Sequence, residues 1–88
     1  MIKVIIPAFN EEGSIVKVIN DIPAIVDEII VVNNGSRDAT ALVAMASGAT
    51  VVDEPQKGYG YACLAGMKHI ANNTKLPSIV VFLSLIHI

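Results

Sequence analysis

Four short apolar runs, rich in β-branched residues, recur along this 88-residue sequence and alternate with segments of helical spacing. The runs cover residues 2–6, 29–32, 50–52 and 79–83. Runs this short, apolar on both faces, are typical of strands buried in a parallel sheet. The alternation predicts the order βαβαβαβ with right-handed crossovers, and we expect the strand order 3-2-1-4. The predicted fold class is therefore α/β, with three layers (αβα) and helices on both faces of the sheet.

The second run ends in Asn33, Asn34 and Gly35, which are turn formers because Asn and Gly tolerate positive φ. A helical pattern follows this turn. We expect Ser36 to cap that helix and Asp38 to lie in its first turn, where the helix dipole favours an acid. Ligands of open α/β sheets bind outside the carboxyl ends of the strands. The polar turn therefore lies at the predicted binding edge.

Two further helices are predicted from the spacing of apolar residues. The first covers about residues 12–20 and is closed by Pro23. The other covers about residues 59–72, where Cys63 is expected to be a small buried hydrophobe and His69 to lie on the exposed face. One side of this last helix carries a set of residues at helical spacing: Leu64, Met67, Lys68 and Ala71.

Composition excludes several classes of protein. The chain is 53% hydrophobic and 16% charged, which argues against disorder. A net charge of −2, no basic cluster and no Trp argue against a nucleic-acid partner. A single cysteine excludes an internal disulfide, and no apolar run approaches the roughly 20 residues of a membrane span. We expect a cytoplasmic protein, and attachment of the full-length protein to the cytoplasmic membrane face stays open.

The loop after the first run, residues 7–12, does not fit a dinucleotide site. Such a site requires G-x-G-x-x-G, and this loop has no glycine and two carboxylates at the expected helix start, which would repel a pyrophosphate. The loop suits the uncharged parts of a ligand, with Phe9 against a flat ring and Glu11 accepting from a hydroxyl or ring N–H. Lys57, which precedes Gly58, is the best-placed cation for a phosphate.

Three segments, in this order and spacing, resemble the start of family 2 glycosyltransferases: VIIPAFNEE at residues 4–12, IIVVNNGSRDAT at 29–40 and EPQKGYGYAC at 54–63. The third is similar to the branch that includes dolichyl-phosphate glucosyl- and mannosyltransferases. The resemblance covers residues 2 to about 83. It implies the N-terminal half of a GT-A fold, with a mostly parallel, Rossmann-like sheet, and an inverting transfer of a sugar from a nucleotide sugar.

The resemblance also implies binding roles. The loop after the first strand would line the base and ribose, and Lys57 would lie near the diphosphate. Asn33 stands where the family has an aspartate near the base, and an amide there hydrogen-bonds without a charge. We expect Phe9, Glu11 and Asn33 to converge on one pocket. The predicted substrate-binding set is Pro7, Ala8, Phe9, Glu11, Asn33 and Lys57, and no residue receives a catalytic or metal-binding role.

The chain departs from the family after the fourth strand. The family has an Asp-x-Asp motif there that holds Mg²⁺ or Mn²⁺ on the diphosphate, and this sequence has Ser84 in place of the first aspartate. His87, in the apolar tail, receives no role. The prediction is a partial nucleotide-sugar-binding domain, residues 1–88, truncated near residue 83 and inactive by itself. The expected partners are a nucleotide sugar and a lipid-phosphate acceptor, with no nucleic acid.

Two alternatives remain from the residues themselves. The first is a non-catalytic nucleotide-binding or interaction fragment. The second is a nucleotidyltransferase-like α/β domain, which is weakened because such a domain needs a Gly- and Arg-rich phosphate loop after the first strand. The sugar, the base, the acceptor and the oligomeric state stay open.

Overall fold

A computed structural model describes residues 1–73 and 79–85 of the chain. Its strands form one parallel sheet in the order β3-β2-β1-β4. The predicted fold class, strand order and parallel pairing are therefore confirmed. The elements in chain order are β1 (Ile2–Ala8), α1 (Ile15–Asp21), β2 (Glu28–Asn33), α2 (Thr40–Ala46), β3 (Thr50–Asp53), α3 (Tyr59–Asn73) and β4 (Ile79–Phe82).

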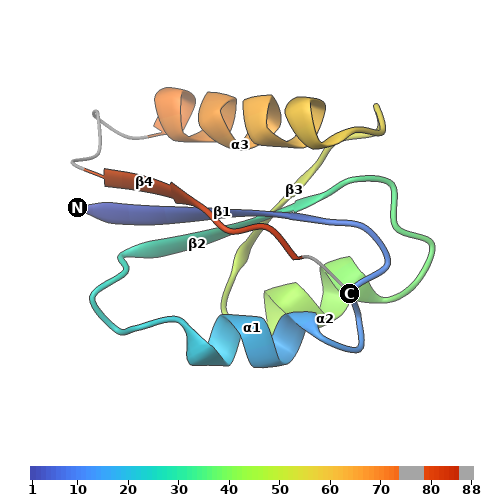
Figure 1. The fold of residues 1–88 in the computed structure, drawn as a ribbon, viewed down its shortest axis with the longest axis horizontal. Coiled ribbons are helices and arrows are strands. Elements are labelled where there is room, and N and C mark those ends of the chain that lie inside the picture. The colour runs from blue at the N-terminus through green and yellow to red at the C-terminus, as the bar shows by residue number, and fades with distance from the viewer. Residues whose placement is uncertain (74–78, 86–88) are drawn as a thin grey trace.

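The helices cover both faces of the sheet. Figure 1 shows α3 on one face and α1 and α2 on the other. Side chains alternate along a strand, so Val4 and Ile6 of β1 pack in the core on the α1 and α2 side, whereas Ile5 packs in the core under α3. The predicted three layers are thus confirmed. Pro77 and His87 lie outside the described residues.

The first two helices begin later than predicted. α1 starts at Ile15, so Glu11 and Glu12 precede it and its first turn holds no acid. α2 starts at Thr40, and the predicted Ser36 cap is wrong because α2 has no side-chain cap. The physical reason is that the polar groups before both helices bond across to one another, and Ser36 Oγ accepts from the N–H of Asn10 at 2.9 Å.

α3 packs on β1 through its smallest residue. A Cβ added at Gly66 would lie 2.7 Å from Cγ2 of the buried Ile5, so α3 packs on this side chain without room for a Cβ. Cys63, predicted to be buried, is half-buried. The side of α3 that carries Leu64, which is 68% exposed, borders a hollow of about 580 Å³ instead of the core.

Replacing Gly66 by alanine is expected to destabilise the fold by about 1–2 kcal/mol. Overpacking against Ile5 costs about 1–3 kcal/mol, and the better helix propensity of alanine returns up to about 1 kcal/mol. Urea unfolding followed by circular dichroism measures the difference. Gly60→Ala is the matched control, because a Cβ on this other α3 glycine meets nothing within 4 Å. Equal stability of the two variants would contradict the close approach of α3 and β1.

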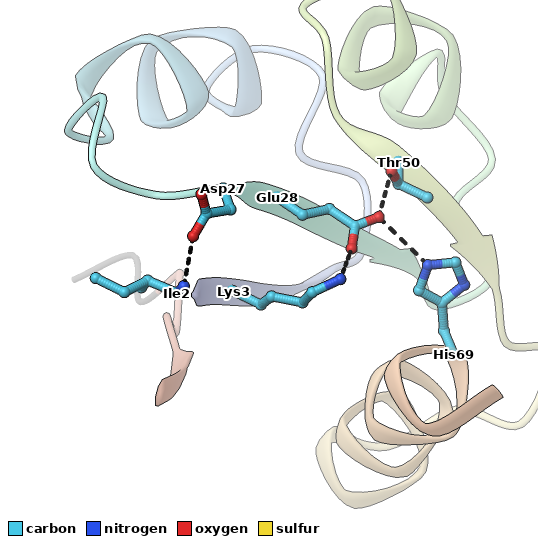
Figure 2. A network of polar contacts seen from close by, with 6 residues as sticks. All are labelled: Ile2, Lys3, Asp27, Glu28, Thr50 and His69. Atoms are coloured by element: carbon cyan, nitrogen blue, oxygen red, sulfur yellow. Dashed lines mark hydrogen bonds and ion pairs between the residues drawn. The ribbon is translucent and has the colours of Figure 1, made fainter. Parts of the chain in front are cut away.

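A polar network lies under α3 at the amino ends of the strands (Figure 2). Lys3 Nζ, which is almost fully buried, lies 2.6 Å from Glu28 Oε1. Glu28 Oε2 accepts from the Thr50 hydroxyl at 2.9 Å and lies 3.4 Å from Nε2 of His69. The prediction of an exposed His69 is therefore wrong, because its ring turns inward toward a carboxylate. Near the same edge, Asp27 accepts from the N–H of Ile2.

This network sets the ionisation of Glu28. Partial burial by itself raises the pKa of Glu28, but hydrogen bonds from Lys3, Thr50 and His69 together outweigh it and hold the pKa below its usual value. Glu28 is therefore ionised at neutral pH and compensates the buried ammonium of Lys3.

In the part of the chain that the structure describes, no helix has the length and apolar character needed to cross a membrane.

Candidate functional site

The loops that follow β1, β2 and β3 meet at the carboxyl edge of the sheet. The strand register pairs Ala8 with Asn33 and Asn33 with Asp53, so the three loops start side by side. A cavity of about 270 Å³ opens between the first and second of these loops and the start of α3. Its lining residues are Pro7, Ala8, Phe9, Glu11, Asn34, Tyr59 and Leu85.

The structure brings four predicted site residues together in this cavity: Pro7, Ala8, Phe9 and Glu11. The Phe9 side chain is partly exposed and borders the cavity. Glu11 Oε2 accepts from the Ser14 hydroxyl at 2.7 Å, which holds the carboxylate at the base of the loop. Their location is thus as expected, and their binding role stays a prediction.

Asn33 lies at the same edge but borders a different hollow. Its Nδ2 donates to Asp53 Oδ1 at 3.0 Å, and its Oδ1 accepts from the N–H of Ser36 at 3.2 Å. The hollow beside it is lined by Gly35, Asp53, Glu54 and Pro55 as well. The predicted convergence of Asn33 with Phe9 and Glu11 is therefore wrong. The alternation of side chains at the end of β2 directs Asn34, and not Asn33, to the cavity.

Asn34 is a site residue that the sequence reasoning treated only as a turn former. Its side chain is almost fully buried and bonds three times to the loop after β3. The Nδ2 group donates to the carbonyls of Glu54 at 3.0 Å and Gln56 at 2.8 Å. The Oδ1 atom accepts from the N–H of Gly58 at 2.9 Å. This amide uses both its donors and its acceptor, so it fixes the path of that loop. A second asparagine after a buried strand was the only sequence signal for this role.

The loop fixed by Asn34 carries Lys57 to the Phe9 ring, which borders the cavity. The Lys57 ammonium lies 5.0 Å from the centroid of the Phe9 ring, within the range of a cation–π contact. The Lys57 side chain also passes over Gly35, where an added Cβ would lie 3.5 Å from Cε. The predicted cation and the predicted ring, which are 48 positions apart in sequence, therefore meet beside one cavity.

The donor set beside the cavity does not fit a divalent metal. Among residues 1–73 and 79–85, no three His, Cys, Asp or Glu side chains lie close enough to hold one. Ser84, which follows β4 in the described part, offers a hydroxyl in place of a carboxylate. Within the described ranges, the structure therefore groups no set of side chains of the kind that holds a metal ion.

Comparisons with known proteins identify the family of this chain. Residues 3–84 match the family described as glycosyl transferase family 2. An uncharacterized glycosyltransferase of Mycobacterium tuberculosis is 42% identical over 79 residues, which is 90% of this chain and 35% of that protein. Glucosyl-3-phosphoglycerate synthase of the same species is 48% identical over 59 residues, 62% of this chain and 18% of the relative. The chain thus spans about a third or less of the length of these two relatives.

A solved structure gives the same result for the fold. Glucosyl-3-phosphoglycerate synthase of Mycobacterium tuberculosis, in complex with Mn²⁺, UDP-glucose and glycerol 3-phosphate, is 35% identical with a TM-score of 0.80. The likeness covers 96% of this chain and 33% of the synthase. The expected GT-A type of sheet is thereby confirmed, and the dolichyl-phosphate branch is not. The family match over nearly the whole chain shows that this protein belongs to glycosyltransferase family 2.

Proposed function

We propose that residues 1–88 form the nucleotide-sugar-binding part of a family 2 glycosyltransferase. The observation that carries the proposal is the meeting of Phe9, Glu11 and Lys57 beside one cavity at the carboxyl edge of the sheet. A planar group, an acceptor and a cation match the base, the ribose and the diphosphate of a nucleotide sugar. The solved relative that contains UDP-glucose supports UDP as the nucleotide to test first.

Each side chain has a distinct chemical role in this proposal. The Phe9 ring stacks on the base, because aromatic faces favour planar partners whatever the base. The Glu11 carboxylate accepts from a ribose hydroxyl or a ring N–H, while the Ser14 hydroxyl keeps it in place. Lys57 brings a positive charge toward the diphosphate. These contacts orient the donor sugar and do not break a bond.

The transfer itself is an inverting displacement of the nucleoside diphosphate by an acceptor. In relatives crystallised with Mn²⁺ or Mg²⁺ and UDP, a divalent cation accompanies the nucleotide. The described residues of this chain provide no ligand set for such a cation. We therefore expect these 88 residues to bind a nucleotide sugar without transferring the sugar.

We propose a phosphate-bearing acceptor for the whole enzyme. The solved relative binds glycerol 3-phosphate or phosphoglyceric acid in separate complexes. A lipid phosphate, which the resemblance suggested, shares the phosphate group with both molecules. A competition assay with the whole enzyme, in which glycerol 3-phosphate, phosphoglyceric acid and a lipid phosphate are offered together, would show which of the three accepts the sugar.

Replacing Phe9 by alanine is expected to lower the affinity of the chain for UDP about tenfold. Stacking of a base on an aromatic ring contributes about 1–3 kcal/mol, and a tenfold change corresponds to about 1.4 kcal/mol. Calorimetric titration with UDP measures the affinity. Phe82→Ala is the matched control, because Phe82 on β4 is 43% exposed and Phe9 is 44% exposed. Equal losses in the two variants, or no UDP binding by the unchanged chain, would contradict the proposed function.

A further inference from the structure

Three successive backbone N–H groups of the loop after β1 donate to side chains of the loop before α2 and of Thr40, the first residue of α2. The N–H of Glu11 donates to Thr40 Oγ1 at 2.8 Å, and the N–H of Glu12 to Asp38 Oδ2 at 3.3 Å. The N–H of Asn10 donates to Ser36 Oγ at 2.9 Å. In return, Asn10 Oδ1 accepts from the N–H of Arg37 at 2.8 Å. We call Asn10, Ser36, Asp38 and Thr40 the interloop clasp.

Thr40 is the buried centre of the interloop clasp. Its side chain is fully buried, and its hydroxyl donates to Asp38 Oδ1 while accepting from the N–H of Glu11. A hydroxyl has a single hydrogen, so the bond to Asp38 leaves the lone pairs of Thr40 directed at the loop. The Thr40 hydroxyl, together with backbone N–H groups, holds the pKa of Asp38 below its usual value. Asp38 is therefore an ionised acceptor at neutral pH.

The interloop clasp spans a backbone position with a positive φ. Asn10 has a φ of +52°, in the left-handed region that few non-glycine residues occupy, although asparagine tolerates it better than most. Asn10 lies between Phe9 and Glu11, the two side chains that border the cavity. Fixing the φ of Asn10 and the N–H of Glu11 therefore fixes the directions in which Phe9 and Glu11 project. Order that exists before binding lowers the entropic cost of binding.

We propose that Thr40 is a positioning residue for the nucleotide site. It acts through the backbone of Glu11, and Asp38 sets the direction of its hydroxyl. The inference rests on the proposed function, because it assigns to Thr40 the task of presenting Phe9 and Glu11 to a nucleotide. Ser47, whose hydroxyl donates to the carbonyl of Val43 beside the same helix, has no such task.

The test compares Thr40→Val, which keeps the shape, with Thr40→Ser, which keeps the hydroxyl, and with Ser47→Ala as the control. UDP affinity is measured by calorimetry, and hydrogen exchange of the Glu11 amide is measured by NMR. Thr40→Val is expected to weaken UDP binding about tenfold and to accelerate exchange at Glu11. For Thr40→Ser, the UDP affinity and the exchange rate at Glu11 are both expected to stay within about twofold of the unchanged chain. Ser47→Ala is expected to equal the unchanged chain in both quantities.

Each other result has a separate meaning. Fast exchange at Glu11 in Thr40→Val with unchanged UDP affinity would overturn the positioning role. Unchanged exchange at Glu11 would overturn the interloop clasp itself. If the unchanged chain binds no UDP, the proposed function fails, and the inference about Thr40 fails with it even if the Glu11 amide is protected. Should Thr40→Val not fold, Asp38→Asn replaces it, with the same expected direction for UDP affinity and the same overturning results.

Discussion

Replacing Glu28 by leucine is expected to lower the free energy of unfolding by up to about 3–5 kcal/mol, the range for removing one partner of a buried ion pair. The charge left uncompensated is the Lys3 ammonium, which is almost fully buried 2.6 Å from Glu28 Oε1. Urea unfolding at pH 7 measures the loss. The double variant Lys3→Met with Glu28→Leu is expected to recover most of it, since neither charge then remains.

A second ion pair provides the control for Glu28. In α1, Lys17 Nζ lies 3.0 Å from Asp21 Oδ2, but the two side chains are 80% and 67% exposed. Water and salt screen such a pair, so Asp21→Ala is expected to cost less than about 1 kcal/mol. A loss of the same size for Glu28→Leu and Asp21→Ala would contradict the buried network under α3.

The Glu28 network also predicts how stability depends on pH. The pKa of Glu28 is lower in the folded chain than in the unfolded chain, so the unfolded state binds the proton more readily in acid. The contribution of Glu28 is complete above the unfolded pKa of about 4.5 and is lost as pH falls through the lower folded value. Glu28→Gln should therefore show a shallower fall in stability below pH 4.5 than the unchanged chain.

Replacing Asn34 by aspartate is expected to destabilise the chain by about 2–3 kcal/mol at pH 7. The change keeps the shape but removes the two N–H donors and sets a carboxylate against the carbonyls of Glu54 and Gln56. A buried polar group left unsatisfied costs about 1–3 kcal/mol, and more when charged. Loss of the fixed loop also releases Lys57, so the affinity for UDP should fall more than the affinity for uridine.

Urea unfolding and calorimetry with UDP and uridine measure the two effects of Asn34→Asp. Asn20→Asp is the control, because Asn20 lies exposed on α1 and does not line the cavity. Protonation of the new carboxyl group restores one hydrogen-bond donor, so the loss of unfolding free energy caused by Asn34→Asp should become smaller toward pH 4. A variant as stable as Asn20→Asp would show that Asn34 does not fix the loop after β3.

The fold was predictable because it depends on local patterns. Short β-branched runs with helical spacing between them predict a parallel sheet, and the polar turns after two strands predict the carboxyl edge at which the cavity lies. Ser36 and Asp38 were assigned to their own helix because local capping is a favourable use of such side chains. In the structure they bond to a loop 26 residues earlier in the chain, and no local pattern reports a partner at that distance.

The inward turn of His69 was unpredictable for the same reason. A histidine on α3 has no sequence signal for a carboxylate 41 positions earlier in the chain. Asn34 provides a second example at the cavity, because its three partners in the loop after β3 are backbone groups: the carbonyls of Glu54 and Gln56 and the N–H of Gly58. A hydrogen bond to a backbone group does not depend on the residue type of the partner, so the sequence carries no signal for it. The cavity residues Phe9 and Glu11 could be found because their chemistry lies in the side chains themselves.

The proposed nucleotide site is tested most directly by mapping the residues of the 88-residue chain that UDP contacts. Backbone amide shifts of the labelled chain are recorded by NMR during titration with UDP. If the cavity is the nucleotide site, shifts are expected in residues 9–12, 34–35 and 57–58 at the carboxyl edge, and none at Lys3, Glu28 and His69 at the opposite edge. Shifts concentrated at the Lys3 edge, or no shifts at millimolar UDP, would contradict the claim that this chain holds a nucleotide sugar in the cavity between Phe9 and Asn34.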